Sequence, residues 1–141
     1  MMKRVFVDTD LLLDVALARQ PILEMSRMVL ALLENNIAIG FVSSNCIANI
    51  YYILRKAGGD EKARTFISKI MEYLTVISIE HSDVVAALKS GFSDFEDGLQ
   101  HFSAMRNQCG CIVTRNNDDY KNSKIAVYSP RDFLSLYIGK H

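Results

Sequence analysis

The fold of this chain is decided by the stretch VFVDTD at residues 5–10, which is followed directly by LLLD at residues 11–14. Its β-branched and aromatic residues predict a short strand that is apolar on both faces, as in a parallel sheet covered by helices on both sides. Open α/β sheets place their sites at the carboxyl ends of such strands, and Asp8 stands at this end. A carboxylate that closes a buried strand is costly unless another group pairs with it, so Asp8 is the first candidate for a functional residue.

Length and composition indicate one ordinary globular domain. The chain has 141 residues, of which 50% are hydrophobic and 23% are charged, and we expect residues 1–141 to form a single domain. No apolar run approaches the ~18 residues that a membrane span needs. Residues 1–4 lead straight into the first strand, so we expect a cytoplasmic protein without a membrane segment.

The charge balance and the cysteines argue against two further classes of protein. Sixteen basic and sixteen acidic residues cancel, so the chain lacks the overall positive field that holds a protein on nucleic acid non-specifically. Any contact with nucleic acid must therefore be local. The three cysteines include no CxxC pair, which argues against a disulfide framework and against a zinc knuckle.

Strand and helix patterns alternate along the chain. After the strand that ends at Asp8, further strands are expected at 37–42, 75–79, 111–114 and 125–128. Apolar residues at helical spacing predict helices at 10–18, 21–34, 44–57, 60–74, 81–89 and 94–107, and a last helix that begins near residue 130. This alternation implies right-handed crossovers and a fold of the α/β class, a three-layer α/β/α sandwich with a central parallel sheet.

Several acidic residues stand where helices are expected to begin. Asp10 and Asp60 are predicted to be N-caps, whose side chains accept hydrogen bonds from free backbone N–H groups. The sequence SDFE at 93–96 has the S-x-x-E pattern of a capping box. Asp14 lies one turn beyond Asp10 and is either solvent-exposed or a group that supports the site.

Carboxylate and amide groups form three clusters at predicted strand ends or helix starts: Asp8 with Asp10, Asp94 with Asp97, and Asn116 with Asp118 and Asp119. Asp94 and Asp97 are three residues apart on a predicted helix, so both point to one side near its N-terminus. If that N-terminus lies beside the first strand, Asp8 converges with Asp94 and Asp97.

Such a convergence points to a metal site. Three negative charges within a few ångströms repel one another strongly unless a cation lies between them. Oxygen ligands without His or Cys nearby suit Mg²⁺ or Mn²⁺, which keep water ligands and meet substrate phosphates. The implied chemistry is metal-assisted attack of water on a phosphodiester.

Two residues near this cluster have more than one interpretation. Asp94 fits a metal ligand, and it equally fits an acid that only interacts with the helix dipole. His101 follows Asp97 by four residues on the same helical face. It either leans toward the site as an acid or base, or it is a partly solvated neighbour.

Four stretches together resemble the PIN domain family: VFVDTDLLLD at 5–14, NIYYIL at 49–54, DFEDGLQ at 94–100 and TRNNDDY at 114–120. The resemblance covers essentially the whole chain, in order and at the expected spacing. It implies a parallel sheet between helices and a Mg²⁺- or Mn²⁺-dependent ribonuclease. Many bacterial members of this size are toxins of VapC-type toxin–antitoxin pairs, which implies RNA as the substrate, an antitoxin partner and a homodimer.

The resemblance also assigns roles to the acidic residues. Asp8 matches the metal ligand on the family's first strand, and Asp97 matches the aspartate of its later helix. Asp94 matches an accessory acid that part of the family carries.

Two further regions match the family, namely the segment that follows the fourth strand and the third helix. Thr114 and Asn116 match the threonine and the usual aspartate after the fourth strand, and Asp119 precedes the aromatic residue. Asn49 stands where many members carry a glutamate, so amides replace two acids, at positions 49 and 116. An amide brings an oxygen but no charge, so the metal should be held more weakly unless Asp10 and Asp119 compensate.

Two other functions fit parts of the sequence. Asp8-Thr9-Asp10 also resembles the D-x-D motif of haloacid-dehalogenase-type phosphatases, but Leu12 stands where those enzymes usually carry Thr or Val, and the chain is short for them. The second alternative is a catalytically weak or inactive PIN-like module that binds RNA or a protein partner.

Overall fold

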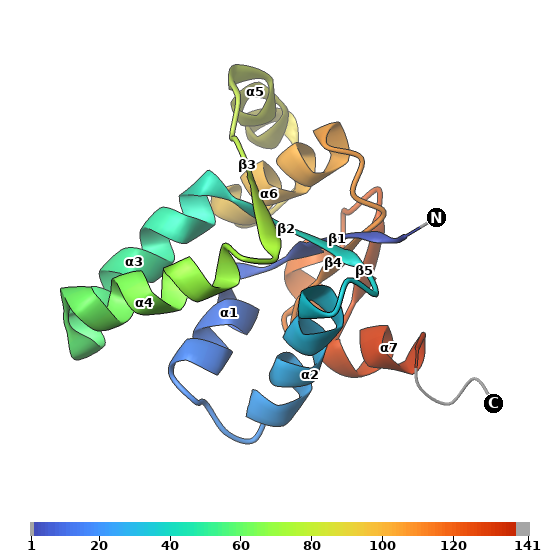
Figure 1. Cartoon of the computed structure of the whole chain (residues 1–141). Helices are drawn as coiled ribbons and strands as arrows, with labels where there is room; N and C mark the ends of the chain where they lie inside the picture. Colours follow the sequence, from blue (N-terminus) through green and yellow to red (C-terminus); the bar gives the residue numbers. More distant parts are fainter. Residues whose placement is uncertain (1, 138–141) are drawn as a thin grey trace.

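The computed structural model describes residues 2–137. In this part of the chain five strands form one parallel sheet in the spatial order β3-β2-β1-β4-β5 (Figure 1). The strands are β1 (Arg4–Val7), β2 (Ile39–Ser43), β3 (Leu74–Ile77), β4 (Cys111–Val113) and β5 (Ala126–Tyr128). The parallel sheet predicted from the alternating pattern is therefore confirmed, with β1 at its centre.

Seven α-helices and one short 3₁₀ helix connect or follow these strands within residues 2–137. They are α1 (Thr9–Ala16), α2 (Leu23–Glu34), α3 (Ser44–Gly58), α4 (Asp60–Ile70), α5 (His81–Lys89), α6 (Phe95–Arg106), η1 (Asn117–Tyr120) and α7 (Pro130–Ser135). The predicted helices are all present, with ends that differ by a few residues. None of the helices in the described part is long and apolar enough to span a membrane.

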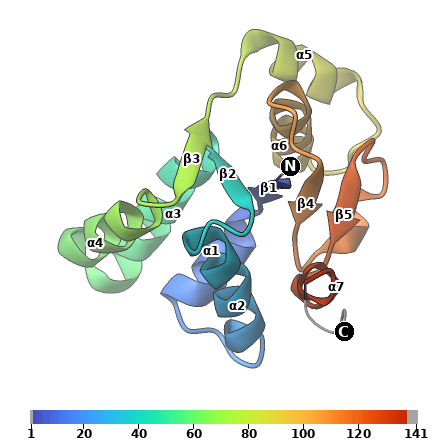
Figure 2. The same ribbon diagram turned by 45° about the vertical axis from the view of Figure 1, so that its right-hand side comes forward.

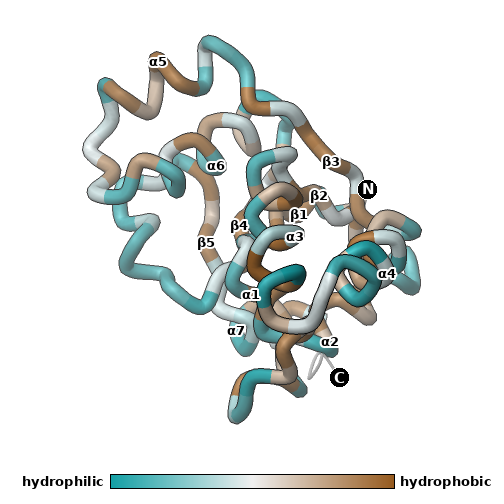
Figure 3. The backbone as a smooth tube through the Cα atoms, turned by 90° about the vertical axis from the view of Figure 1, so that its left-hand side faces the viewer, coloured by the Kyte–Doolittle hydropathy of each residue, from teal (hydrophilic) through white to brown (hydrophobic). Residues whose placement is uncertain are grey.

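The helices cover both faces of the sheet. Val5 and Val7 point to one face, where they pack with apolar residues of α1, α2, α3, α4 and α7. Phe6 points to the other face and packs with Ile112 and with Ala104 of α6. Figure 2 shows α5 and α6 above the sheet and α1, α2 and α7 below it. In Figure 3 the hydrophobic stretch around β1 and β2 lies inside, and hydrophilic turns such as those of α4 lie outside.

Three predicted helix caps are wrong by one or two residues. The N-cap of α1 is Asp8, not Asp10, because the backbone is extended at Asp8 (φ −70°, ψ 151°) and turns helical directly after it. The N-cap of α4 is Gly59, and Asp60 is already the first helical residue. The N-cap of α6 is Asp94, whose carboxylate accepts a hydrogen bond of 3.0 Å from the backbone N–H of Asp97. The pattern at 93–96 is therefore not a capping box.

The register of the sheet brings the ends of β1 and β4 together. Val7 pairs with Val113, and the backbone N–H of Asp8 donates to the carbonyl oxygen of Val113 at 3.1 Å. Asp8 and Thr114, the residues that follow these two strands, are consequently neighbours. They stand at the carboxyl edge of the sheet, where ligands of open α/β folds bind.

Candidate active site

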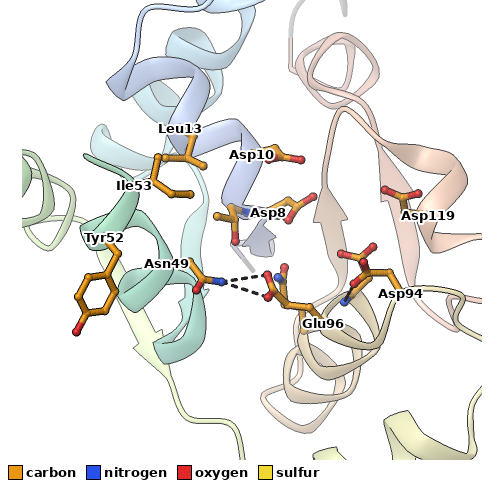
Figure 4. A pocket seen from close by; sticks show the side chains of 12 residues that line it. Asp8, Asp10, Leu13, Asn49, Tyr52, Ile53, Asp94, Glu96 and Asp119 are labelled. Carbon is orange, nitrogen blue, oxygen red and sulfur yellow. Dashed lines mark hydrogen bonds between the residues drawn. The ribbon is translucent and has the colours of Figure 1, made fainter. Parts of the chain in front are cut away.

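A pocket of about 400 Å³ lies at this edge of the sheet, between α1, α3, α6 and η1. Figure 4 shows the side chains that line it: Asn49 and Glu96 point toward each other, and Tyr52 points away from the carboxylates. The lining includes six carboxylates, namely Asp8, Asp10, Asp94, Glu96, Asp97 and Asp119. The predicted convergence of the acids that follow β1 with the acids that begin α6 is therefore present.

Asp8 is the most buried acid of the pocket, with 5% of its surface exposed. One carboxylate oxygen accepts a hydrogen bond of 2.7 Å from the backbone N–H of Thr9, and the other accepts one of 2.7 Å from the hydroxyl of Thr114. Burial is the main cause that raises the pKa of Asp8 to about 6; the charges of Asp10 and Asp119 also raise it, while these two hydrogen bonds lower it. The carboxylate is thus held in one orientation in a place that disfavours its charge.

Asp94 and Asp97 occupy the first turn of α6, on the wall opposite Asp8. Burial raises the pKa of Asp97 to about 7, and the charges of Asp8 and Asp94 contribute to this rise. The hydroxyl of Tyr120 lies 3.4 Å from a carboxylate oxygen of Asp97, as a hydrogen-bond donor. Asp8, Asp94 and Asp97 therefore form one electrostatically coupled group.

Asn116 does not line this pocket but holds two of its neighbours in place. Its side-chain amide donates a hydrogen bond of 2.8 Å to Asp10, and its backbone N–H donates one of 3.0 Å to the hydroxyl of Thr114. Asp119, three residues later, does line the pocket from the exposed end of η1. The segment after β4 is therefore fastened to the start of α1.

Asn49 lines the pocket from α3 and meets an acid that the sequence analysis did not select. Its amide nitrogen donates to both carboxylate oxygens of Glu96, at 3.2 Å each (Figure 4). The S-x-x-E pattern at 93–96 predicts a capping role for Glu96 instead. Adjacent residues of a helix do not share a face, so the spacing of Glu96 and Asp97 gave no signal that both line the pocket.

The donors of this pocket fit a hard divalent cation. Among residues 2–137 no three His, Cys, Asp or Glu side chains are already gathered into a closed metal-binding group. The described residues that line the pocket nevertheless include six carboxylates and neither His nor Cys, and carboxylate oxygens are the ligands that Mg²⁺ and Mn²⁺ select. The raised pKa values of Asp8 and Asp97 reflect burial and mutual repulsion, and a bound cation would relieve that repulsion.

Comparison with known proteins agrees with this geometry. A family model described as "PIN domain" matches residues 4–118. The chain belongs to the PIN domain family. Ribonuclease VapC1 of Aquifex aeolicus is 26% identical over an alignment of 140 positions, which covers 96% of this chain and 96% of that protein.

Solved structures share the fold of this PIN domain at lower sequence identity. VapBC2 from Rickettsia felis, bound to a DNA fragment from its promoter, aligns with a TM-score of 0.69 and 17% identity over 89% of this chain and 98% of that chain. Mycobacterium tuberculosis VapC20, described as a sarcin-ricin loop cleaving toxin, aligns with a TM-score of 0.62 and 12% identity over 77% and 86%. The membership of the PIN family disfavours the phosphatase alternative.

His101 does not belong to the site of this PIN domain, contrary to one interpretation of the sequence. The side chain is fully buried, its Nε2 accepts a hydrogen bond of 3.0 Å from the backbone N–H of Lys124, and its ring packs against Phe92 and Phe102. Burial lowers its pKa to about 4, so the imidazole is neutral near pH 7. The histidine is a core residue that ties α6 to the loop before β5.

Proposed function

We propose that this PIN domain is a Mg²⁺- or Mn²⁺-dependent endoribonuclease that hydrolyses phosphodiester bonds of single-stranded or structured RNA. The observation that carries the proposal is the position of Asp8 opposite Asp94 and Asp97 in one pocket of a PIN-family chain. The name of the curated relative, a ribonuclease, supports RNA as the substrate.

The roles follow from how each residue is held. Asp8, Asp94 and Asp97 would hold the cation, which, when bound, lowers the pKa of a water molecule and stabilises charge on the phosphate. Thr114 orients the carboxylate of Asp8 through its hydroxyl. Asp119 adds negative charge at the exposed rim of the pocket. Asp10 adds a further carboxylate, which Asn116 fixes.

We further propose that the protein is the toxin of a type II toxin–antitoxin pair. The support is the shared fold with VapBC2 and with VapC20, which is described as a toxin, together with the VapC name of the curated relative. An antitoxin protein is the proposed partner. A homodimer remains a prediction from the family resemblance, and a cytoplasmic location remains a prediction from the sequence.

The test compares wild type with Asp8→Asn, and uses Asp118→Asn as the control. Asp118 lies on η1 and is exposed, outside the lining of this pocket. Mn²⁺ binding is measured by calorimetry, and cleavage of single-stranded RNA is followed with the same samples. We expect wild type and Asp118→Asn to bind Mn²⁺ and to cleave, and Asp8→Asn to lose both properties. Wild type without binding or cleavage at millimolar Mn²⁺ would refute the proposal.

One observation favours the alternative of a binding module with weak or no activity. The pocket has Asn49 on its α3 side. The side-chain amide of Asn116 donates its hydrogen bond to Asp10 and does not line the pocket. Fewer charged ligands weaken the binding of a hard cation. Wild type that binds RNA or Mn²⁺ without cutting any RNA would favour this alternative.

A further inference from the structure

The side chain of Glu96 faces the pocket, although it stands at a helix start from which it could extend into solvent. It is the second residue of α6 and is half-buried, while its neighbours Asp94 and Phe95 are exposed. Its carboxylate lies in the same pocket as those of Asp8 and Asp97. The charge of Glu96 contributes to the raised pKa of Asp97, so the two carboxylates repel, and a flexible glutamate at a helix start is expected to turn outward.

The amide of Asn49 opposes that repulsion. Its nitrogen lies 3.2 Å from each oxygen of the Glu96 carboxylate, so the carboxylate is held against the α3 wall (Figure 4). The two residues are 47 positions apart, and their contact depends on the packing of α3 and α6 around the pocket.

The position of Glu96 balances the distribution of charge in the pocket. The α3 side contributes Asn49, Tyr52 and Ile53, and none of these is acidic. The other carboxylates come from the segment after β1, the start of α6 and η1. Glu96 begins on α6 but places its charge beside α3, so a cation in the pocket would have carboxylates on both sides.

We propose that Glu96 is a further carboxylate of the cation site and that Asn49 is the positioning residue that holds it there. The inference rests on the proposed function, because it assumes that a divalent cation occupies this pocket. It gives the amide at position 49 a role, since the acid that α3 lacks is supplied from α6 and oriented by α3.

Four variants separate the charge of Glu96 from its link to Asn49. Glu96→Gln keeps an acceptor for the Asn49 amide but removes the charge, and Asn49→Ala removes the link but keeps the charge. Asn49→Asp combined with Glu96→Gln exchanges donor and acceptor without changing either side chain's size, and it moves the carboxylate to α3. Glu61→Gln is the matched control, because Glu61 is the exposed second residue of α4.

The readouts are the Mn²⁺ dissociation constant from calorimetry and the thermal midpoint in EDTA. We expect Glu96→Gln and Asn49→Ala each to weaken Mn²⁺ binding roughly tenfold, as for residues that ligate or orient ligands. The exchanged pair should regain an affinity close to that of wild type. Glu96→Gln should melt no earlier than wild type, because it loses a repelled charge, and Glu61→Gln should bind Mn²⁺ like wild type.

Each contrary outcome overturns a defined statement. Glu96→Gln with wild-type affinity, or an exchanged pair without recovery, would overturn the role of Glu96. If Glu96→Gln and Asn49→Ala bind Mn²⁺ more weakly and both also unfold at a lower temperature in EDTA, the Asn49–Glu96 contact only joins two helices. If Asp8→Asn abolishes binding while Glu96→Gln does not, this inference fails and the proposed function stands. If wild type binds no Mn²⁺, both fail.

Discussion

The hydroxyl of Thr114 donates a hydrogen bond of 2.7 Å to the carboxylate of Asp8, across the ends of two neighbouring strands. Thr114 is fully buried, so this bond is shielded from competing water. It lowers the pKa of Asp8, whereas burial raises it. The orientation and the charge of Asp8 are therefore set by the pairing of β1 with β4.

Thr114→Val tests this relationship, because valine keeps the shape of threonine and removes the hydroxyl. We expect Mn²⁺ affinity to fall about tenfold, as for other residues that orient metal ligands. The free energy of unfolding at pH 8 should fall by about 2 kcal/mol, since a charged acceptor loses one of its donors. Calorimetry and urea denaturation measure the two effects. The control Thr75→Val, at an exposed position of β3, should leave Mn²⁺ affinity unchanged. Unaltered affinity in Thr114→Val would contradict the role of this hydroxyl.

The raised pKa of Asp8 predicts how stability depends on pH without metal. The folded pKa of about 6 lies above the unfolded value of about 3.9, so the folded state binds more protons between these values. Stability from this group is complete below the unfolded pKa and is lost as the pH rises through 6. Asparagine does not titrate, so Asp8→Asn lacks this loss. The free energy of unfolding of Asp8→Asn minus that of wild type should therefore increase by on the order of 1 kcal/mol between pH 5 and pH 8.

The measurement is urea unfolding of both proteins in EDTA at several pH values. His101 acts in the opposite direction, because its folded pKa of about 4 lies below the unfolded value and its charging destabilises the fold as the pH falls. Both proteins contain His101, so its effect cancels in their difference. A difference that does not change with pH would show that Asp8 is not a strained carboxylate.

Much of the site was predictable because it follows from local patterns and from sheet geometry. The apolar run before Asp8 could only be a buried strand, and parallel strands present their carboxyl ends at one edge. The spacing of Asp94 and Asp97 places both on one side of a helix start. The packing of α6 beside β1 then brought these acids to Asp8, as expected.

The remaining features depend on packing that no local pattern encodes. The sequence at 93–96 satisfied a capping pattern, while the side chain of Glu96 is in fact directed by Asn49 on another helix. Asp8 and Asp10 have the same intrinsic preference for the N-cap, and the sheet decides between them because β1 ends at Val7. The contacts that bury His101 include Phe92 and the loop at Lys124, both of which lie outside the helical pattern of α6.

Asp14 predicts a strong coupling between two arginines. It is fully buried and accepts hydrogen bonds from Arg19 at 3.3 Å and from Arg115 at 2.9 Å, both of which are partly exposed. Replacing either arginine with alanine leaves the other to neutralise Asp14, so each change should cost about 1 kcal/mol. Replacing both leaves an unpaired buried charge, which should cost about 3 to 5 kcal/mol.

Urea denaturation of the two single variants and the double variant measures this coupling as a double-mutant cycle. Arg27→Ala is the control, because its 3.5 Å ion pair with Glu24 is exposed and should contribute almost nothing. A double variant whose loss equals the sum of the two single losses would show that Asp14 does not need either arginine for its burial.

The turn between α3 and α4 predicts opposite effects for two adjacent glycines. Gly59 has φ 97° and ψ 166°, a conformation that is essentially restricted to glycine, although a Cβ there would meet no other atom within 4 Å. Gly59→Ala should therefore lower the free energy of unfolding by about 1 to 3 kcal/mol through backbone strain alone. Gly58 is the last residue of α3, and a Cβ there would approach only the flexible side chain of Lys62, at 3.2 Å. Gly58→Ala should raise the free energy of unfolding by about 0.5 kcal/mol, because alanine favours the helix. Urea denaturation measures the free energy of unfolding of the two variants. If both variants change it in the same direction, the assignment of strain to Gly59 is wrong.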